Sequence, residues 1–410
     1  MKIYGKNALV GQSGGPTAAI NASLSGVIAE WLEKQSGTLY GMANGITGIL
    51  DERLYNLTEI FREKRGDIEL LKLTPAAALG SCRKKLPSYE KDAEFYTELF
   101  GLFEKYEIGY FFYIGGNDSM DTVDKLSAYA NVNGIDIKFV GIPKTVDNDL
   151  CGTDHTPGFG SAAKFIASVC AETKRDTAVY TQKSVTVIEI MGRDAGWLTA
   201  SAALAKTKYA DGPDLIYLPE APFSFAQCFK DIEKCWESSP DVLIAVSEGI
   251  RDKDGSYISA DSSKKDTFGH AMLCGAANAV KNRVEEHFGC KVRAIEVNTP
   301  QRAAGHCLSL TDINESFNVG AFGVREALSG KSGIMAATVR VSDTPYSVKN
   351  ASFPVSEIAN KVKEVPRDFI NADGNYVTEK ALTYLRPLIL GECTLTYSDG
   401  VPMHYVFPKI

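Results

Sequence analysis

Several short apolar runs in this chain end within two residues of a glycine, a proline or a polar residue, and a stretch with helical spacing of apolar residues follows. A strand that is buried on both faces of a sheet gives such a continuous apolar run, and a helix after it returns the chain for the next parallel strand. The runs are residues 7–10, 110–114, 138–142, 185–190 and 242–246. The pattern therefore predicts an α/β protein with parallel sheets.

The composition limits the class of protein and the kind of partner. The chain has 410 residues, of which 44% are hydrophobic and 23% are charged, as in a globular protein with two or three compact units. There are 44 Lys and Arg against 51 Asp and Glu, a formal net charge of −7. Because no global basic field exists to hold a nucleic-acid backbone, we expect no nucleic-acid partner and only local binding of anions.

The cysteines and the apolar runs bear on the location of the protein. The nine cysteines include no C-x-x-C pair, and their odd number argues against a disulfide framework. No apolar run approaches the roughly 18 residues that span a bilayer. We therefore expect a cytoplasmic protein with no membrane partner.

Two common kinds of catalytic site find no support in the sequence. The five histidines lack the spacing of a zinc site, and no G-x-S-x-G hydrolase motif is present.

Glycine-rich segments follow the first two runs, at residues 11–17 and 115–121. Ligands of open α/β sheets bind beyond the carboxyl ends of strands, so these segments are candidate binding loops. Backbone N–H groups at Gly14 and Gly15 can hold phosphate, although neither the P-loop nor the dinucleotide fingerprint fits. Gly116 lets a phosphate approach the main chain, and Asp118 offers a hard oxygen ligand for Mg²⁺. Ligand-free turns and a simple helix cap are the alternatives.

The segment after the third run reads Pro-Lys-Thr-Val-Asp-Asn-Asp at residues 143–149. Its two carboxylates, Asp147 and Asp149, lie beside Lys144 and Thr145. This arrangement suits a general base with a partner that fixes metal or substrate. An aspartate-rich turn without function is the alternative.

Arginines with glycine or small residues beside them form a further set of candidates. They are Arg83 in Gly-Ser-Cys-Arg, Arg193 in Met-Gly-Arg, Arg293 and Arg302. An arginine presents a planar, permanently charged fork that binds phosphate through two hydrogen bonds. Each arginine alone also fits a surface ion pair. Together they supply the cations that a bisphosphorylated product requires.

These segments, in this order, resemble the phosphofructokinase family over residues 5–370. The resemblance implies two three-layer, Rossmann-like α/β domains with the active site in the cleft between them. It also implies that fructose 6-phosphate is phosphorylated to fructose 1,6-bisphosphate. We expect a phosphoryl-donor domain from residues 1–150 plus about 305–345, and a fructose 6-phosphate domain from 151–304 plus about 346–372. Residues 373–410 are expected to be a C-terminal appendage.

The resemblance also implies roles for single residues. Asp147 matches the base that takes the proton of the sugar 1-hydroxyl, with Thr145 and Asp149 beside it. Arg83 and Arg193 match residues that meet the migrating phosphoryl group. The contacts to the sugar hydroxyls and the 6-phosphate are matched by Met191, Gly192, Glu248, Arg293 and Arg302. Because one or two of these arginines cross a subunit boundary in the family, we expect a homodimer or homotetramer.

The identity of the phosphoryl donor depends on two positions. Family members that use ATP usually carry glycine there, whereas this chain has Asp118 and Lys144, the pair found in members that use pyrophosphate. A side chain at 118 intrudes on the inner phosphate of a nucleotide, and the lysine cation can bind pyrophosphate. The resemblance thus implies a pyrophosphate-dependent enzyme, with Gly14, Gly15 and Gly116 also at the donor. An ATP-dependent phosphofructokinase and a non-catalytic regulatory subunit of the same fold are the alternatives.

Three positions depart from the family pattern. Asn117 replaces the usual aspartate, so we expect Mg²⁺, the predicted cofactor, to be held by Asp118 together with Asn117. Ser184 replaces an arginine that contacts the 6-phosphate, and the adjacent Lys183 can supply a point charge in its place. Thr299 stands where a histidine is common, which leaves the 6-phosphate pocket less well defined than the catalytic loop.

Overall fold

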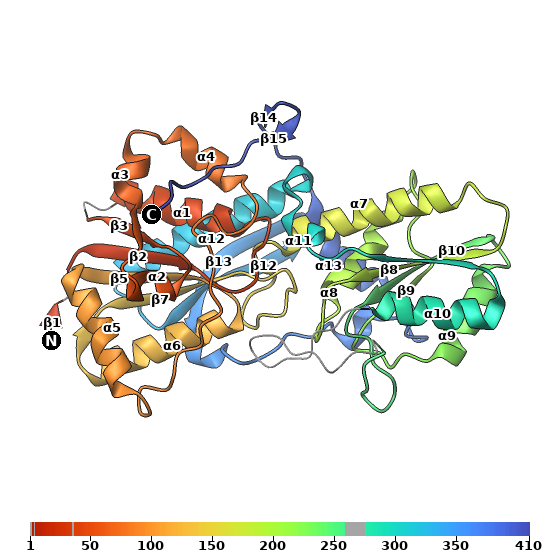
Figure 1. Ribbon diagram of the computed structural model, residues 1–410, viewed down its shortest axis with the longest axis horizontal. Helices are drawn as coiled ribbons and strands as arrows, with labels where there is room; N and C mark the ends of the chain where they lie inside the picture. The colour runs from red at the N-terminus through yellow and green to blue at the C-terminus, as the bar shows by residue number, and fades with distance from the viewer. Residues whose placement is uncertain (1, 4, 35–36, 259–274) are drawn as a thin grey trace.

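The computed structural model describes residues 2–3, 5–34, 37–258 and 275–410. The protein is elongated and has two lobes, each built on its own sheet (Figure 1). The first lobe comprises a seven-stranded sheet of order β13-β12-β7-β5-β2-β3-β4 and the helices packed on it. The second lobe comprises a four-stranded sheet of order β11-β8-β10-β9 and its helices. The predicted α/β class is confirmed.

The first lobe takes most of its elements from the first 150 residues. Its strands are β2 (Asn7–Gln12), β3 (Leu39–Met42), β4 (Leu54–Asn56), β5 (Ile108–Gly115), β7 (Lys138–Pro143), β12 (Ile334–Asp343) and β13 (Tyr346–Pro354), with β1 (Lys2–Ile3) and β6 (Ile135–Asp136) as a separate pair. Its helices are α1 (Ile20–Lys34), α2 (Ile46–Leu50), α3 (Leu57–Arg62), α4 (Gly66–Lys72), α5 (Ala93–Lys105), α6 (Asn117–Val132) and α12 (Leu310–Leu328), with a 3₁₀ turn η3 (Val355–Glu357).

Both faces of the seven-stranded sheet are buried, which explains the continuous apolar runs. In β5, Phe111 packs in a core with helices α5 and α6, whereas Phe112 packs in a core with helices α1 and α12 on the other face. Side chains alternate between the faces of a strand, so each run serves two cores at once. Helices α1 and α12 cross closely, because Gly26 and Gly320 have no side chain to hold the two backbones apart.

The second lobe lies between residues 159 and 305, with additions from the C-terminal part of the chain. Its strands are β8 (Ser184–Ile190), β9 (Leu215–Tyr217), β10 (Asp241–Ser247) and β11 (Lys291–Glu296). Its helices are α7 (Phe159–Thr177), α8 (Trp197–Ala200), α9 (Phe225–Cys235), α10 (Ala276–Phe288), α11 (Pro300–Ala303) and α13 (Glu379–Leu385), with 3₁₀ turns η1 (Ser201–Ala205), η2 (Gly305–Cys307), η4 (Arg367–Phe369) and η5 (Arg386–Ile389).

The second sheet is also covered on both faces. Leu243 of β10 packs in the core that includes α7, η1 and α13, and Ile244 packs in the core that includes α9 and α10. All five apolar runs of the sequence form strands, and these strands pair in parallel with their neighbours of that set. Each lobe is therefore a three-layer unit.

Two expected boundaries need correction. Residues 346–354 form β13, which pairs antiparallel with β12 in the first sheet rather than joining the second lobe. Residues 373–410 are not a mere appendage. Ala381, Leu385 and Leu388 complete the core of the second lobe, and Tyr405 and Phe407 pack on the first. The short β14 (Tyr397–Ser398) and β15 (Val401–Pro402) between these two contacts form a hairpin that projects from the molecule in Figure 1.

One late segment connects the two lobes, and we call residues 358–365 the strap. It starts at Ile358, which packs in the core of the first lobe, and ends at Val365, which packs in the core of the second. In its middle, Val362 forms an isolated antiparallel bridge with Leu150, in the segment that follows β7. Over the described residues, every helix is too short or too polar to reach across a bilayer.

Candidate active site

The largest group of predicted site residues lies in one cleft between the lobes, with a volume of about 560 Å³. The loops after β2, β5 and β7 form its first wall, and the loops after β8 and β10 form the second. The predicted residues that line it are Gly14, Gly15, Arg83, Gly116, Asn117, Asp118, Lys144, Thr145, Asp147, Asp149, Met191, Arg193, Glu248 and Arg302. The structure thus brings together segments that are far apart in the sequence.

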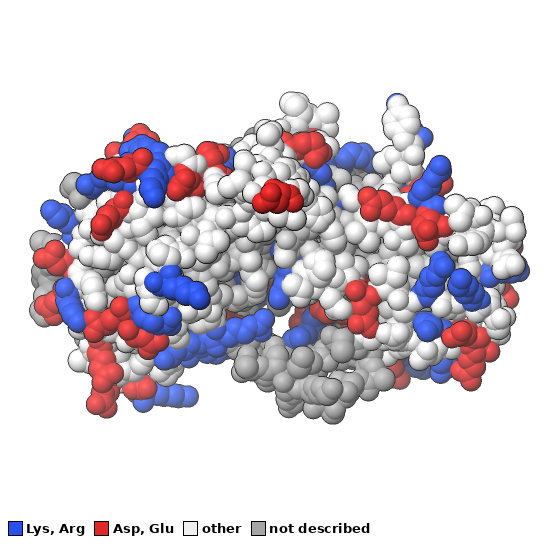
Figure 2. All heavy atoms as spheres, turned by 45° about the horizontal axis from the view of Figure 1, so that its top comes forward, with Lys and Arg blue, Asp and Glu red and all other residues white. Residues whose placement is uncertain are grey.

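The register of the first sheet explains why its three loops meet. Strands β2, β5 and β7 are parallel neighbours, with Gln12 aligned to Ile114 and Gly115 aligned to Pro143. Their carboxyl ends therefore lie side by side at one edge of the sheet, where ligands of open α/β sheets bind. On the face shown in Figure 2, cationic and anionic side chains are interspersed over both lobes. The described residues on this face therefore form no broad cationic surface that would bind an anion outside the cleft.

Lys144 is buried at the junction of these loops. Its ammonium donates a hydrogen bond to the carbonyl oxygen of Gly15 at 2.6 Å, and its backbone N–H donates to Gly115 at 3.0 Å. A Cβ on Gly14 would lie 3.2 Å from the Lys144 Nζ, and a Cβ on Gly15 would lie 3.3 Å from Nη1 of Arg302. Glycine at these positions lets both cations reach the cleft. Burial lowers the pKa of Lys144 to about 8, against the opposing effect of Asp147 and Asp149.

Two carboxyl groups stand beside this lysine in the catalytic loop, residues 145–149. Burial raises the pKa of Asp147 to about 7, and the negative charges of Asp149 and Glu248 add to this effect. Burial also raises the pKa of Asp149. The Asp147 backbone N–H donates to the Thr145 hydroxyl oxygen at 3.2 Å, which shapes the turn. A carboxyl whose pKa lies near neutrality can take a proton in one direction and return it in the other.

Three polar side-chain atoms of the cleft lack a partner. Among the described residues, Arg193 Nε, Arg302 Nε and Asn117 Oδ1 are buried without a hydrogen bond. Most buried polar atoms in native proteins are paired, so unpaired donors on permanent cations fit an anionic ligand. The unpaired amide oxygen fits a hard cation, the ligand type that Mg²⁺ prefers. The cleft thus offers both the donors for phosphate and an oxygen for metal.

The wall from the second lobe is held by side chains near the Met-Gly-Arg segment. The Gly192 N–H donates to Glu248 Oε1 at 3.2 Å, and the Met191 N–H donates to Gln301 Oε1 at 3.0 Å. Gly192 has a φ of 139°, which favours glycine at this turn. Gln301 is buried and was not predicted from the sequence. Its only signal was its position directly before Arg302.

Lys183 and Arg293 do not line the cleft of the chain that contains them. Lys183 directly precedes β8, and its Nζ lies 4.7 Å from the centre of the Trp236 ring. Arg293 pairs with Thr186, near the amino end of β8, whereas the cleft lies beyond the carboxyl end of that strand. Their expected contact with the 6-phosphate stays a prediction that requires a second subunit. Ser184 is the first residue of β8, at the same distant end.

Sequence reasoning missed two groups of lining residues. Lys84 and Lys85 follow Arg83 into the cleft, and Lys85 Nζ lies 3.8 Å from Asp118 Oδ1. The three consecutive cations at residues 83–85 could have predicted that Lys84 and Lys85 also face an anionic ligand. Asn360 and Val362 reach the cleft from the strap. No motif marks them, because their position depends on where the chain crosses between the lobes.

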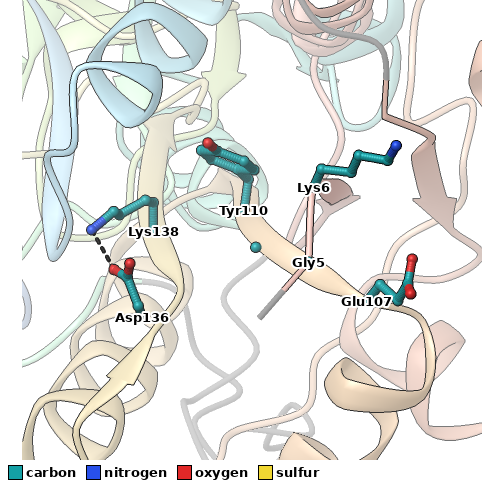
Figure 3. Close-up of a pocket in the computed structure, with 7 residues that line it drawn as sticks. Gly5, Lys6, Glu107, Tyr110, Asp136 and Lys138 are labelled. Carbon is teal, nitrogen blue, oxygen red and sulfur yellow. Dashed lines mark hydrogen bonds and ion pairs between the residues drawn. The ribbon is translucent and has the colours of Figure 1, made fainter. Parts of the chain in front are cut away.

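A second hollow, of about 480 Å³, lies at the amino ends of strands β5 and β7 (Figure 3). Lys6, Glu107, Tyr110, Asp136 and Lys138 line it, and Lys138 forms an ion pair of 2.6 Å with Asp136. It contains no residue that the sequence marked as functional. It also lies at the other end of the strands from the loops that usually bind ligands. The interlobe cleft is therefore the candidate active site.

Comparison with known proteins places this geometry in a family. A family model described as phosphofructokinase matches residues 7–320. The pyrophosphate–fructose 6-phosphate 1-phosphotransferase of Methylococcus capsulatus is 41% identical over 401 residues, which cover 97% of this chain and 94% of the relative. The protein of the same name from Halomonas elongata is 40% identical over 400 residues, or 97% and 94% of the two chains. A sulfofructose kinase of Alkalicoccus urumqiensis is 31% identical over 353 residues, or 86% and 88%.

Solved structures agree with these matches. The pyrophosphate-dependent phosphofructokinase of Nitrosospira multiformis superposes with a TM-score of 0.87 at 38% identity, covering 98% of this chain and 96% of that one. The protein of that name from Marinobacter aquaeolei gives 0.86 at 36% identity, covering 98% of each chain. Both findings confirm the fold and the family that the motifs predict. The chain belongs to the phosphofructokinase family.

Proposed function

We propose that this protein transfers a phosphoryl group from pyrophosphate to the 1-hydroxyl of fructose 6-phosphate, releasing phosphate and fructose 1,6-bisphosphate. The observation that carries the proposal is the position of Lys144, buried in the donor side of the cleft within the same loop as Asp147. The relatives that are about 40% identical over nearly the whole chain bear the name of this reaction. We propose that the transfer runs in both directions, with phosphate as the acceptor in the reverse reaction.

The donor side of the cleft suits pyrophosphate. The Lys144 ammonium is fixed by the Gly15 carbonyl, next to the main chain of Gly14. A fixed cation beside glycine N–H groups binds a compact dianionic phosphate without needing a nucleoside. Asp118 projects into the same space with its side chain 45% exposed, where it would occupy the position of the inner phosphate of a nucleotide. These two residues support pyrophosphate over ATP.

The chemical step belongs to Asp147. We propose that its carboxylate removes the proton from the sugar O1 while that oxygen attacks phosphorus in line with the departing phosphate. The new O1–P bond forms as the P–O bond to the leaving phosphate breaks. Arg83 and Arg193 line the cleft on opposite lobes and neutralise charge on the migrating group. In the reverse direction, protonated Asp147 returns the proton to O1.

We propose Mg²⁺ as the cofactor, held by Asn117 and Asp118. The unpaired buried Oδ1 of Asn117 and the adjacent carboxylate of Asp118 match the oxygen ligands of this ion. When bound, the ion supplies positive charge that neutralises the phosphate oxygens. Both residues lie at the start of α6, whose N-terminus contributes further positive potential to the same place.

The acceptor side is formed by Met191, Glu248 and Arg302 in the described cleft. Arg302 presents its unpaired Nε there, which suits the 6-phosphate of the sugar. We propose that Lys183 and Arg293 complete this pocket from a neighbouring subunit, since in their own chain they lie at the far end of β8. The active unit is accordingly a homodimer or homotetramer, in which each cleft is completed by a second copy.

The test is product formation by the purified protein alone. We expect fructose 1,6-bisphosphate to accumulate when the protein is mixed with fructose 6-phosphate, pyrophosphate and Mg²⁺, with no nucleotide or second protein present. Omitting Mg²⁺ should abolish the product. A protein that is inert alone and active only after a second polypeptide is added would support the regulatory alternative and contradict the proposal.

A further inference from the structure

The strap, residues 358–365, lies against the catalytic loop and is a part of the chain beyond the matched family segment, residues 7–320. The backbone N–H of Lys363 donates to the carbonyl oxygen of Asp149 at 2.7 Å. Val362 forms an isolated antiparallel bridge with Leu150. The end of the catalytic loop is therefore fixed by main-chain contacts with a segment more than 200 residues later.

Asn148 separates the two carboxylates of the catalytic loop and takes no part in the cleft. It is fully buried, and its φ of 54° is unusual for a residue other than glycine. Its Oδ1 accepts hydrogen bonds from the Thr156 N–H at 3.1 Å and from Lys363 Nζ at 3.2 Å. Its Nδ2 donates to the Tyr384 hydroxyl at 3.0 Å. The conformation of Asn148 decides where its neighbours Asp147 and Asp149 point.

The Lys363 ammonium makes three hydrogen bonds, which uses all of its donors. Besides Asn148 Oδ1, it donates to the carbonyl oxygen of Asp154 at 2.7 Å and to that of Thr153 at 3.3 Å. Tyr384 joins the same group, because its hydroxyl donates to the Asp154 carbonyl at 2.6 Å. A buried ammonium is costly unless its donors are satisfied, so this arrangement holds the loop rigidly.

The charges around Lys363 tie it to the carboxylates as well as to the backbone. Burial lowers the pKa of Lys363 to about 8, and the carboxylates of Asp154 and Asp149 and the thiol of Cys151 oppose that effect. The guanidinium of Arg340 lowers the pKa further. In the other direction, Lys363 is the largest of the charges that lower the pKa of Asp149. Removing this cation should raise the pKa of Asp149, so that the catalytic carboxyl pair holds a proton up to a higher pH.

We propose that Lys363, with Tyr384, is a positioning residue for phosphoryl transfer, which holds Asn148 so that Asp147 meets the sugar hydroxyl. The inference rests on the proposed function, since it assigns Asp147 as the base. Neither residue lines the cleft, so each acts on the reaction through the loop. A displacement of about 1 Å in a catalytic group can cost roughly 100-fold in rate, so loosening this support should be visible in kcat.

The first test compares Lys363→Met with Lys164→Met in the purified enzyme. Lys164 is the matched control, because its ammonium also donates to main-chain carbonyls of a late segment, at Leu308 and Gly391, but not near the cleft. We expect Lys363→Met to lower kcat by about 10- to 100-fold with KM for fructose 6-phosphate changed less than about threefold. Lys164→Met should leave both constants within about twofold of the parent.

A pH profile separates positioning from mere structural support. The acid limb of kcat reports the coupled Asp147 and Asp149 pair, which Glu248, Lys144 and Arg193 also face. Loss of the Lys363 cation should move this limb to higher pH by about half a pH unit, and Lys363→Arg should restore it. The proposal would be overturned if Lys363→Met lowered kcat only as much as Lys164→Met does and left the acid limb at its parental pH.

A measurement made without substrate distinguishes failure of the proposed function from failure of the positioning role of Lys363. In Lys363→Met, amide hydrogen exchange of a peptide covering residues 145–156 should be faster than in Lys164→Met and in the parent. An inactive parent enzyme would reject the proposed function, whereas an active parent with unchanged kcat and exchange in Lys363→Met would reject only this inference.

Should Lys363→Met fail to fold, Tyr384→Phe tests the same support by removing a single hydroxyl. Its control is Tyr376→Phe, since Tyr376 packs against the same core without bonding to the loop. We expect a fall in kcat of about 5- to 10-fold and faster exchange over residues 145–156 in Tyr384→Phe alone. Equal kcat and equal exchange in the two variants would overturn the role of this network.

Discussion

The ammonium of Lys144 donates a hydrogen bond to the carbonyl oxygen of Gly15 and so joins the loop after β7 to the loop after β2. In the proposed function, this position assigns Lys144 to the wall that receives the phosphoryl donor rather than to the sugar pocket. Its charge is available to a ligand because the two glycines beside it leave the space open. The proposed choice of donor depends on this contact.

Replacing Lys144 by methionine should damage use of pyrophosphate selectively. We expect kcat/KM for pyrophosphate to fall by about 100-fold, because a buried charge-assisted contact to phosphate is lost. KM for fructose 6-phosphate should change less than about threefold. Steady-state kinetics with each substrate varied in turn gives both values. Lys138→Met, at the opposite end of the strands, is the control, and equal effects in the two variants would remove Lys144 from the donor site.

Asp147→Asn should nearly abolish the chemical step while keeping the shape of the loop. An amide cannot accept the proton of the sugar hydroxyl, so kcat should fall by about 10³-fold or more. Binding of fructose 6-phosphate, measured by isothermal titration calorimetry, should weaken by less than about threefold. A variant that keeps more than a tenth of the parental kcat would show that another group removes the proton.

Asp147 and Lys144, the two perturbed groups that the proposed mechanism places against the substrates, set the expected pH dependence. Asp147 must be ionised to act as a base, and its pKa is about 7, so forward activity should fall as the pH drops below that value. Lys144 must be protonated to bind pyrophosphate, and its pKa is about 8, so kcat/KM for pyrophosphate should fall as the pH rises above that value. The profile should be bell-shaped with a narrow optimum. In Lys144→Arg the alkaline limb should move upward, and a limb that stays near pH 8 would belong to another group.

The close crossing of α1 and α12 makes a prediction about stability. A Cβ at Gly26 would lie against the backbone of Phe317, so Gly26→Ala should lower the free energy of unfolding by about 1–3 kcal/mol. Gly101 lies in α5 with nothing within 4 Å of an added Cβ, so Gly101→Ala should raise that free energy by about 0.5–1 kcal/mol. Denaturant titration of both variants gives the comparison. Similar changes in both would mean that the two helices can separate without cost.

Much of the first lobe and of the cleft could be predicted because the signals are local. A strand buried on both faces must be an apolar run, and the loop at its carboxyl end must carry the ligand-binding residues. The sequence alone therefore places Asp118, Lys144 and Asp147 at one edge of the sheet. Met191 and Glu248 follow the same rule in the second sheet.

The parts that escaped prediction depend on long-range packing. β13 joins the first sheet only because it pairs antiparallel with β12, and no local pattern states which lobe receives a hairpin. Lys363 reads as an ordinary lysine in a polar stretch, and its contact with Asn148 arises where the strap crosses between the lobes. Arg293 was among the predicted site residues, yet it lies far from the cleft because its register places it beside Thr186, near the amino end of β8.

The most direct test of the account compares the two phosphoryl donors on one preparation of the purified enzyme. With fructose 6-phosphate and Mg²⁺ saturating, kcat/KM is measured for pyrophosphate and for ATP at pH 7.5. We expect a preference for pyrophosphate of about 100-fold or more, because Lys144 places a cation in the donor wall and the Asp118 side chain takes up the space of a nucleotide's inner phosphate. A higher kcat/KM for ATP would contradict the account.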